Sequence, residues 1–166
     1  QASHAKFIRP HLDAVAARHQ VTATLWQRSG DDRVVLVDRS ESDTAMRVHM
    51  QIGQRLPMYV AALGRCMAAH SGLSKPALRQ AFRALRWENP PSFEQYWRSV
   101  EDARRVGFAV DAGQYVLGAT TVSARLCMIS AGAVTCGMRR HVMRLNSISV
   151  AMASDGAQEY TRSSSA

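Results

Sequence analysis

The sequence predicts an α+β domain with an antiparallel sheet, and three observations support this prediction. First, 166 residues make about one domain, and they are too few for two domains that each bury a substantial core. Second, 46% hydrophobic and 20% charged residues are ordinary globular usage, which excludes collagen-like, disordered and coiled-coil chains. Third, segments with helical and with strand periodicity follow one another in the order helix, strands, helices, strands, which favours the α+β class.

A helix and a hairpin are predicted at the start of the chain. Residues 1–20 are expected to form a linker or first helix, because four residues recur there at helical spacing. These residues are Ile8, Leu12, Val15 and His19. From residue 21 the period changes to two and β-branched residues dominate, so residues 21–39 are expected to pair as two strands. Residues 45–50 are a weaker candidate for a third strand.

Two helices are predicted next. Pro57 interrupts the chain, and the apolar residues 60–70 then form a buried helix that ends at Gly72. Ser74 is expected to be the N-cap of the second helix. Pro76 lies in its first turn, where the missing N–H of proline costs nothing.

A third helix and the late strands complete the prediction. Ser92 and Gln95 have the spacing of a capping box, and Gly107 is placed to end the helix that they begin. Its buried side is predicted to contain Phe93, Trp97, Val100 and Ala103. The late strands are predicted at residues 108–111, 119–126 and 143–152. No structure is assigned to residues 127–142, and the polar residues 154–166 are expected to be disordered.

The chain is basic, with 21 Lys and Arg against 13 Asp and Glu and a net charge of +8. A basic balance favours anionic partners, but these cations are scattered, so a solvated surface is preferred to a nucleic-acid-binding face. Three cysteines without a Cys-x-x-Cys pair fit reduced thiols in the cytosol. With no long apolar run and no signal peptide in the sequence, we expect a cytoplasmic protein without a membrane partner.

Known catalytic and cofactor motifs are absent from the sequence. The six histidines and three cysteines show no zinc spacing, and the sequence has neither Gly-x-Ser-x-Gly nor a phosphate-binding glycine loop. We therefore expect no metal site, no cofactor and no catalytic residues. Gly53, Pro57 and Gly64 lie just before and within the predicted buried helix, where they avoid large side chains. Either close packing or the close approach of a ligand to the backbone would explain them.

Two motifs of the sequence resemble the effector-binding domain of IclR-type bacterial transcriptional regulators. The first motif is formed by Gly53, Leu56-Pro57-Met58 and Gly64-Arg65-Cys66, where the family has Gly-Lys-Ala at the last step. The second motif is formed by Arg104 or Arg105, Gly107-Phe108, Asp111, Gly113-Gln114 and Gly118. With the matching order of hairpin and helices, the resemblance covers residues 7–152.

The resemblance implies a GAF-like fold, in which a curved antiparallel sheet is flanked by helices on both sides. Residues 21–153 would be the effector-binding domain, with a pocket between the sheet and the first buried helix. A small organic effector, a carboxylate or an aromatic compound, would bind there. The residues carried over to this pocket are Ala62, Leu63, Gly64, Asp111, Ala119, Thr121 and Ser149.

The family likeness also implies partners. Effector binding would modulate operator binding by a separate N-terminal winged helix-turn-helix, in a repressor or an activator that is a homodimer or homotetramer. No segment before residue 21 is long enough for such a DNA-binding domain, so we expect it to be absent from this chain.

Three alternatives stay open at this stage. Asp111 is expected to serve the effector, so that Asp111→Ala weakens the response with little loss of fold, or else to cap the turn after Val110. The domain is expected to be a sensor and not an enzyme, although a small-acid enzyme using Asp111 and Thr121 is a less favoured reading. The third reading is a dimerisation or protein-interaction module that has lost its pocket.

Overall fold

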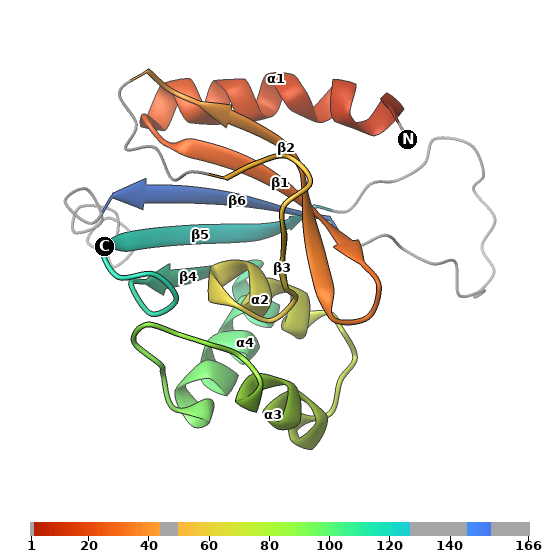
Figure 1. Cartoon of the computed structure of the whole chain (residues 1–166), viewed down its shortest axis with the longest axis vertical. Coiled ribbons are helices and arrows are strands. Elements are labelled where there is room, and N and C mark those ends of the chain that lie inside the picture. The colour runs from red at the N-terminus through yellow and green to blue at the C-terminus, as the bar shows by residue number, and fades with distance from the viewer. Residues whose placement is uncertain (1, 44–49, 127–145, 154–166) are drawn as a thin grey trace.

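A computed structural model places a six-stranded antiparallel sheet between a single helix on one face and three helices on the other (Figure 1). The structure describes residues 2–43, 50–126 and 146–153. The elements in chain order are α1 (Ala2–His19), β1 (Thr22–Ser29), β2 (Arg33–Glu41), β3 (Arg55–Pro57), α2 (Ala61–Ala69), α3 (Lys75–Arg83), α4 (Phe93–Val106), β4 (Phe108–Ala112), β5 (Ala119–Leu126) and β6 (Asn146–Ala153). The predicted α+β class with helices on both sides of the sheet is confirmed.

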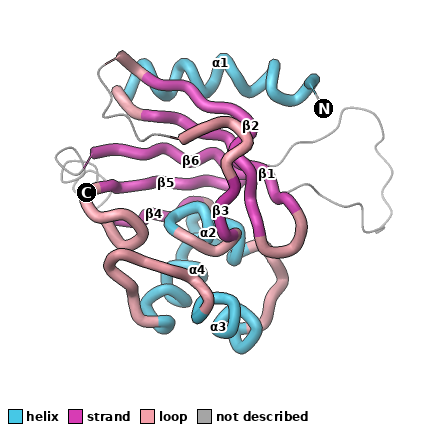
Figure 2. The backbone as a smooth tube through the Cα atoms, in the orientation of Figure 1, coloured by secondary structure: helices cyan, strands magenta, loops and turns pink. Residues whose placement is uncertain are grey.

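The sheet consists of a three-stranded part, β1 to β3, and the hairpin of β4 and β5, and the two parts are joined by β6. Its strand order is β3-β2-β1-β6-β5-β4, so β6 lies between β1 and β5 (Figure 2). Thr22 and Gln27 pair with Ala151 and Asn146, while Ala119 and Leu126 pair with Ala153 and Asn146. The two halves of the sheet are therefore connected only by hydrogen bonds to a strand from the far end of the sequence.

Helix α1 covers the outer face of the sheet, over β1 and β2 (Figure 1). The buried residues of this outer cluster are Ile8, Leu12, Ala16, Ala23 and Leu25. Polar groups at the rim complete the contact, since Arg9 forms an ion pair with Asp38 at 2.9 Å. The Ser40 hydroxyl also donates a hydrogen bond to Asp13.

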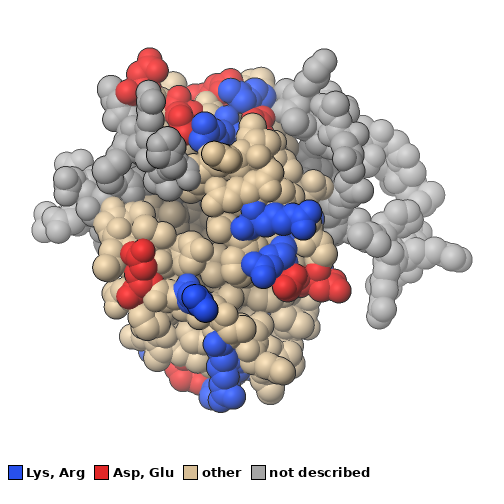
Figure 3. Space-filling view, in the orientation of Figure 1, with Lys and Arg blue, Asp and Glu red and all other residues tan. Residues whose placement is uncertain are grey.

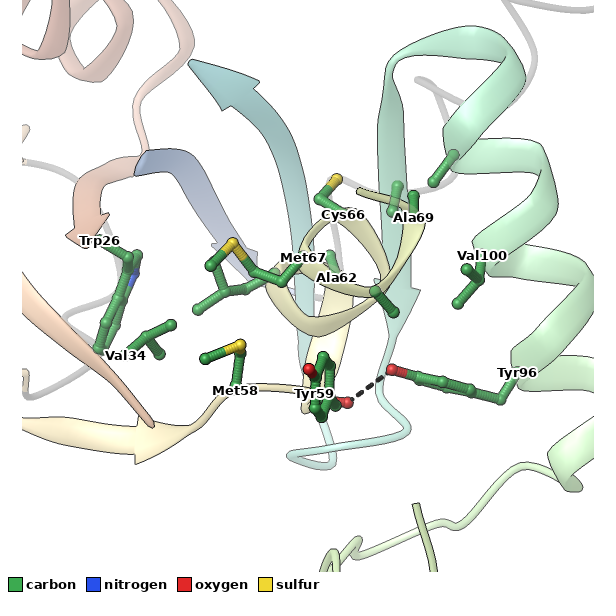
Figure 4. Packing of buried hydrophobic residues seen from close by; sticks show 14 of the residues in the cluster. Trp26, Val34, Met58, Tyr59, Ala62, Cys66, Met67, Ala69, Tyr96 and Val100 are labelled. Carbon is green, nitrogen blue, oxygen red and sulfur yellow. Dashed lines mark hydrogen bonds between the residues drawn. The ribbon is translucent and has the colours of Figure 1, made fainter. Parts of the chain in front are cut away.

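Helices α2, α3 and α4 cover the inner face, where the larger core lies. Trp26, Val34, Met58 and Met67 meet there between the sheet and α2 (Figure 4). On the other side of α2, the Tyr96 hydroxyl donates a hydrogen bond of 2.9 Å to the backbone carbonyl of Tyr59 (Figure 4). This bond fastens α4 to the segment that leads into α2.

The predicted caps of α3 and α4 are confirmed, whereas α2 ends at Ala69 with His70 as its C-cap, two residues before the glycine that was predicted to stop it. The Ser74 hydroxyl accepts from the backbone N–H of Ala77, and Ser92 and Gln95 form the complete capping box of α4. Gly107 ends α4 in the left-handed conformation, with φ of 91°, that glycine adopts without steric cost. The buried side of α4 differs from the prediction in three positions, because Tyr96 is fully buried there while Phe93 and Trp97 are only partly buried.

The strands required one correction. Residues 55–57 form the short edge strand β3, paired with residues 33–35, where the proline had been expected only to interrupt the chain. Proline is tolerated at a sheet edge because its missing N–H needs no partner there. The predictions for residues 44–49, 127–142 and 154–166 lie outside the described residues.

Charged side chains are scattered over the surface, as expected. Blue and red groups lie beside each other on the face seen in Figure 3, and they form no continuous basic patch on that face. Many are paired, for example Glu94 with Lys75 at 2.8 Å and with Arg79 at 2.5 Å. Such exposed pairs are weak and solvated.

Candidate functional site

Helix α2 lies over the inner face of β4, β5 and β6, at the place where the effector pocket was predicted. All of its residues are buried, and no side chain caps its start at Val60. Ala61 has a φ of 54°, a left-handed conformation that L residues other than glycine rarely adopt. The first turn is therefore buried, and no side chain accepts hydrogen bonds from its backbone N–H groups. The helix dipole favours negative charge at this end of the helix.

Gly64 is required by packing. A Cβ at this position would collide with the backbone of Tyr59, which crosses directly against the helix. The Gly64 N–H also donates a hydrogen bond of 2.6 Å to the carbonyl of Val60. Of the two roles considered for this glycine, close packing against the chain itself is present in the structure.

Arg65 is a buried cation beneath the sheet-facing side of α2. Its side chain is 2% exposed and forms an ion pair of 3.1 Å with Asp111, which is equally buried. A second guanidinium nitrogen donates to the side-chain oxygen of Gln114. The guanidinium carbon lies 5.7 Å from the ring centre of Trp87 and 5.5 Å from that of Tyr96. The carboxylate, the amide oxygen and the two aromatic rings together compensate the loss of hydration of the Arg65 guanidinium.

Asp111 connects α2 to the loop after β4. One carboxylate oxygen accepts from Arg65, and the other accepts a hydrogen bond of 3.1 Å from the backbone N–H of Tyr115. The turn-capping role is therefore present in the structure. The buried ion pair argues against the expectation that Asp111→Ala leaves the fold nearly intact, because this change would leave the buried Arg65 without a counter-charge.

Other predicted site residues share the inner face with Asp111. Thr121 pairs with Asp111 across β5 and β4, and residues paired directly in an antiparallel sheet project to the same face. Ser149 of β6 pairs with Ser123 on one side and with Thr24 on the other. Ala119 stands apart from this group, because its backbone closes the loop of residues 113–118 through the carbonyl that accepts from Gly113.

Two hydroxyl groups on the inner face have no hydrogen-bond partner. The Oγ1 atoms of Thr121 and Thr22 are buried and unpaired, as are Nε of Arg65 and the indole nitrogen of Trp87. Thr24, by contrast, accepts a hydrogen bond of 3.0 Å from the indole of Trp26. Buried polar groups are nearly always paired, so unpaired ones are places where a ligand or water would be bound most favourably.

The thiol of Cys66 is an inert part of this core. Burial raises its pKa to about 11, so it is protonated at neutral pH. It donates a hydrogen bond of 3.0 Å to the backbone carbonyl of Ser123, which fixes α2 on β5. Burial also raises the pKa of Tyr96 far above its ordinary value, so this phenol remains a hydrogen-bond donor.

The described residues contain no group of three or more histidine, cysteine or acidic side chains placed to bind a metal ion. Two surface hollows lie away from the predicted pocket, one at residues 51–54 and the other along α3 between Lys75 and Arg83. None of the described helices combines the length and the apolar character needed to cross a membrane.

The structure thus brings together most of the predicted site residues. Ala62, Leu63 and Gly64 lie in the first turn of α2, over the face that carries Asp111 and Thr121. Arg65 and Thr22 were not predicted. Arg65 belongs to the Gly-Arg-Cys motif, and Thr22 lies at the start of a predicted strand. The sequence therefore drew attention to both positions but indicated no function for either.

Comparison with known proteins gives one family. A family model described as bacterial transcriptional regulator IclR C-terminal matches residues 3–152. The search of curated proteins found no relative of this chain.

Solved structures share the fold at low sequence identity. An IclR transcriptional regulator from Alicyclobacillus acidocaldarius is 24% identical with a TM-score of 0.70, over 91% of this chain and 57% of that one. The IclR of Thermotoga maritima is 16% identical with a TM-score of 0.69, over 96% and 63% of the two chains. An IclR homolog of Microbacterium hydrocarbonoxydans, complexed with 4-hydroxybenzoate, is 18% identical with a TM-score of 0.70, over 95% and 61%. The chain therefore spans about three fifths of the length of these three proteins.

Proposed function

The chain belongs to the family of IclR C-terminal domains of bacterial transcriptional regulators, and we propose that residues 21–153 are its effector-binding domain. In this proposal a small organic molecule binds between the first turn of α2 and the inner face of the sheet. Support for this comes from Ala62, Leu63 and Gly64 in the first turn of α2 and from Asp111 and Thr121 on the strands that α2 covers. Ser149 on β6 and Ala119, which stands apart from this group, are proposed from the family likeness.

One observation carries the proposal. The inner face holds a buried hydroxyl without a partner at Thr121, on a strand that α2 packs against, and the start of α2 is uncapped and strained. Unsatisfied polar groups and left-handed non-glycine residues each cost about 1–3 kcal/mol, and such costs concentrate at binding sites. A ligand that hydrogen-bonds to the Thr121 hydroxyl and to the helix amides would recover part of that cost.

The chemistry of the place favours a carboxylate or a related acceptor. Backbone N–H groups at a helix start bind anions, and the charge of Arg65 is already balanced by Asp111, so the anion would rest on dipoles and hydroxyls. The Microbacterium hydrocarbonoxydans homolog was crystallised with an aromatic carboxylate, 4-hydroxybenzoate. This compound is the first one to test on the present chain.

The proposed partners follow from the same family. In the complete regulator, effector binding would alter operator binding by a separate DNA-binding domain, in a cytoplasmic homodimer or homotetramer. The chain itself would act as a sensor without turnover, cofactor or metal.

Thermal unfolding of the 166-residue chain with a panel of aromatic acids, small aliphatic acids and neutral aromatics tests the proposal. A ligand at 100 times its dissociation constant adds about 2.7 kcal/mol, which raises the melting temperature by several degrees. A dose-dependent rise for one chemical class supports a sensor. If a cooperatively unfolding sample shows no rise with any class, the chain is an interaction module and the seven site residues are structural.

A further inference from the structure

Thr22 begins β1 on the inner face of the sheet and has no role in the packing described above. Its residue is 0% exposed, and its Oγ1 atom has no hydrogen-bond partner. The side chain faces inward because Thr24, two residues along the strand, bonds to the inward-facing Trp26, whereas Ala23 belongs to the cluster under α1. A buried hydroxyl without a hydrogen bond destabilises the folded state, because no interaction compensates the loss of its hydration.

Thr22 lies in the same cross-strand row as Thr121. Both residues pair with Ala151 of β6, Thr22 from the β1 side and Thr121 from the β5 side. The row continues from Thr121 to Asp111. Two buried, unpaired hydroxyls thus face the same side of the sheet, one on each side of β6.

The spacing of this row limits what could satisfy both hydroxyls. Two strand spacings separate Thr22 from Thr121, which is about 9.6 Å. A single carboxylate has oxygens about 2 Å apart and hydrogen bonds of about 2.8 Å, so it reaches one hydroxyl and not both. A ligand that engages both must carry polar groups at two ends of a short body.

We propose that Thr22 is a ligand-binding residue and that, with Thr121, it selects effectors that carry a hydrogen-bonding group at each end. This inference rests on the proposed function and extends it, because it adds a residue on β1 and a chemical class.

The variant Thr22→Val separates a binding role from a structural one. Valine has nearly the shape of threonine and removes the unpaired hydroxyl, so the unliganded chain should melt about 2–4 °C higher. The same variant should bind a two-ended ligand about fivefold more weakly, since one neutral hydrogen bond is lost. A hydroxyl needed for folding would instead make the variant melt at a lower temperature, and that result would overturn the inference.

Binding is measured by calorimetry with 4-hydroxybenzoate and with benzoate, which lacks the second polar end. The wild-type chain should prefer 4-hydroxybenzoate, and this preference should disappear in either Thr22→Val or Thr121→Val. Thr120→Val is the matched control, because Thr120 neighbours Thr121 on β5 but faces away from α2, so both affinities should stay unchanged.

The outcomes distinguish the two proposals. If the wild-type chain binds 4-hydroxybenzoate and Thr22→Val binds it with unchanged affinity and preference, the assignment of Thr22 is wrong while the sensor function stands. If the wild-type chain binds neither compound nor any other acid of the panel, the proposed function fails and takes the inference with it.

Discussion

The two faces of the sheet are closed in different ways. On the outer face, α1 packs against β1 and β2 mainly through aliphatic side chains, and the half-exposed Arg9 and Asp13 of α1 bond to Asp38 and Ser40, which are largely buried. On the inner face, α2 carries Arg65 into the protein and pairs it with Asp111 beneath the helix. The outer face therefore depends mainly on apolar contact area, whereas the inner face combines the larger apolar core with a buried ion pair.

This difference indicates which face is specialised. An apolar contact with exposed ion pairs stabilises a domain without further demands on its sequence. A buried ion pair contributes little net stability compared with apolar side chains of similar size, but it is very sensitive to the loss of one partner. The inner face thus contains destabilising features that packing does not require, such as the buried ion pair and the left-handed Ala61. Such features concentrate at binding sites.

The largest effect is predicted for Arg65→Met on the inner face. The change leaves Asp111 buried without its counter-charge, and the free energy of unfolding should fall by about 3–5 kcal/mol. Urea titration measures this loss. Adding Asp111→Asn removes the stranded charge and keeps an acceptor for Tyr115, so the double variant should regain about 2 kcal/mol. Equal stability of the single and double variants would contradict the buried pair.

A pH dependence is predicted next, from Cys66. Its pKa in the folded chain is raised to about 11 by burial, so the protonated thiol stabilises the fold below the ordinary thiol range. This contribution, about 3 kcal/mol, is lost as the pH rises from about 8.5 through 11. Denaturation at several pH values should show the stability gap between wild type and Cys66→Ala closing over this range. A constant gap would argue against a buried thiol.

A smaller effect is predicted for Leu12→Ala on the outer face. Leu12 is 0% exposed in the outer cluster, and the lost apolar area with its cavity should cost about 2–3 kcal/mol. Urea titration of this variant is compared with that of His11→Ala, whose exposed side chain should change stability by less than about 0.5 kcal/mol. If the two variants are equally stable, α1 does not close the outer face.

The smallest effect is predicted for Arg9→Ala at the outer rim. Arg9 is half exposed in its ion pairs with Asp13 and Asp38, so its removal should cost about 0.5 kcal/mol at low salt. The difference from wild type should shrink in 1 M NaCl, because salt screens exposed charges. A loss as large as that of Arg65→Met would mean that the two faces do not differ in the way described.

Local signals in the sequence predicted most of the fold. Ser74, Ser92 and Gly107 act on backbone groups within a few residues, so their roles as caps can be read without knowing the tertiary structure. The short strand at residues 55–57 could not be predicted in this way. Its pairing depends on the position of β2, and its proline argues against a strand unless the segment is known to lie at an edge.

The candidate site was less accessible from sequence. Arginine is usually exposed, and only the approach of Asp111, Gln114 and Trp87 from other elements explains why Arg65 is buried. Thr22 falls in the same row as Thr121 only because it pairs with Ala151, a residue more than a hundred positions later in the chain. Both features arise from contacts that sequence periodicity does not encode.

The central position of β6 has a consequence for how the chain folds. Each hairpin can pair as soon as it is synthesised, but the groove between β1 and β5 is filled only by residues 146–153. The inner-face row that contains Thr22 and Thr121 therefore forms only after residues 146–153 have been synthesised. Such long-range closure slows folding and leaves two strand edges open to wrong partners in the meantime.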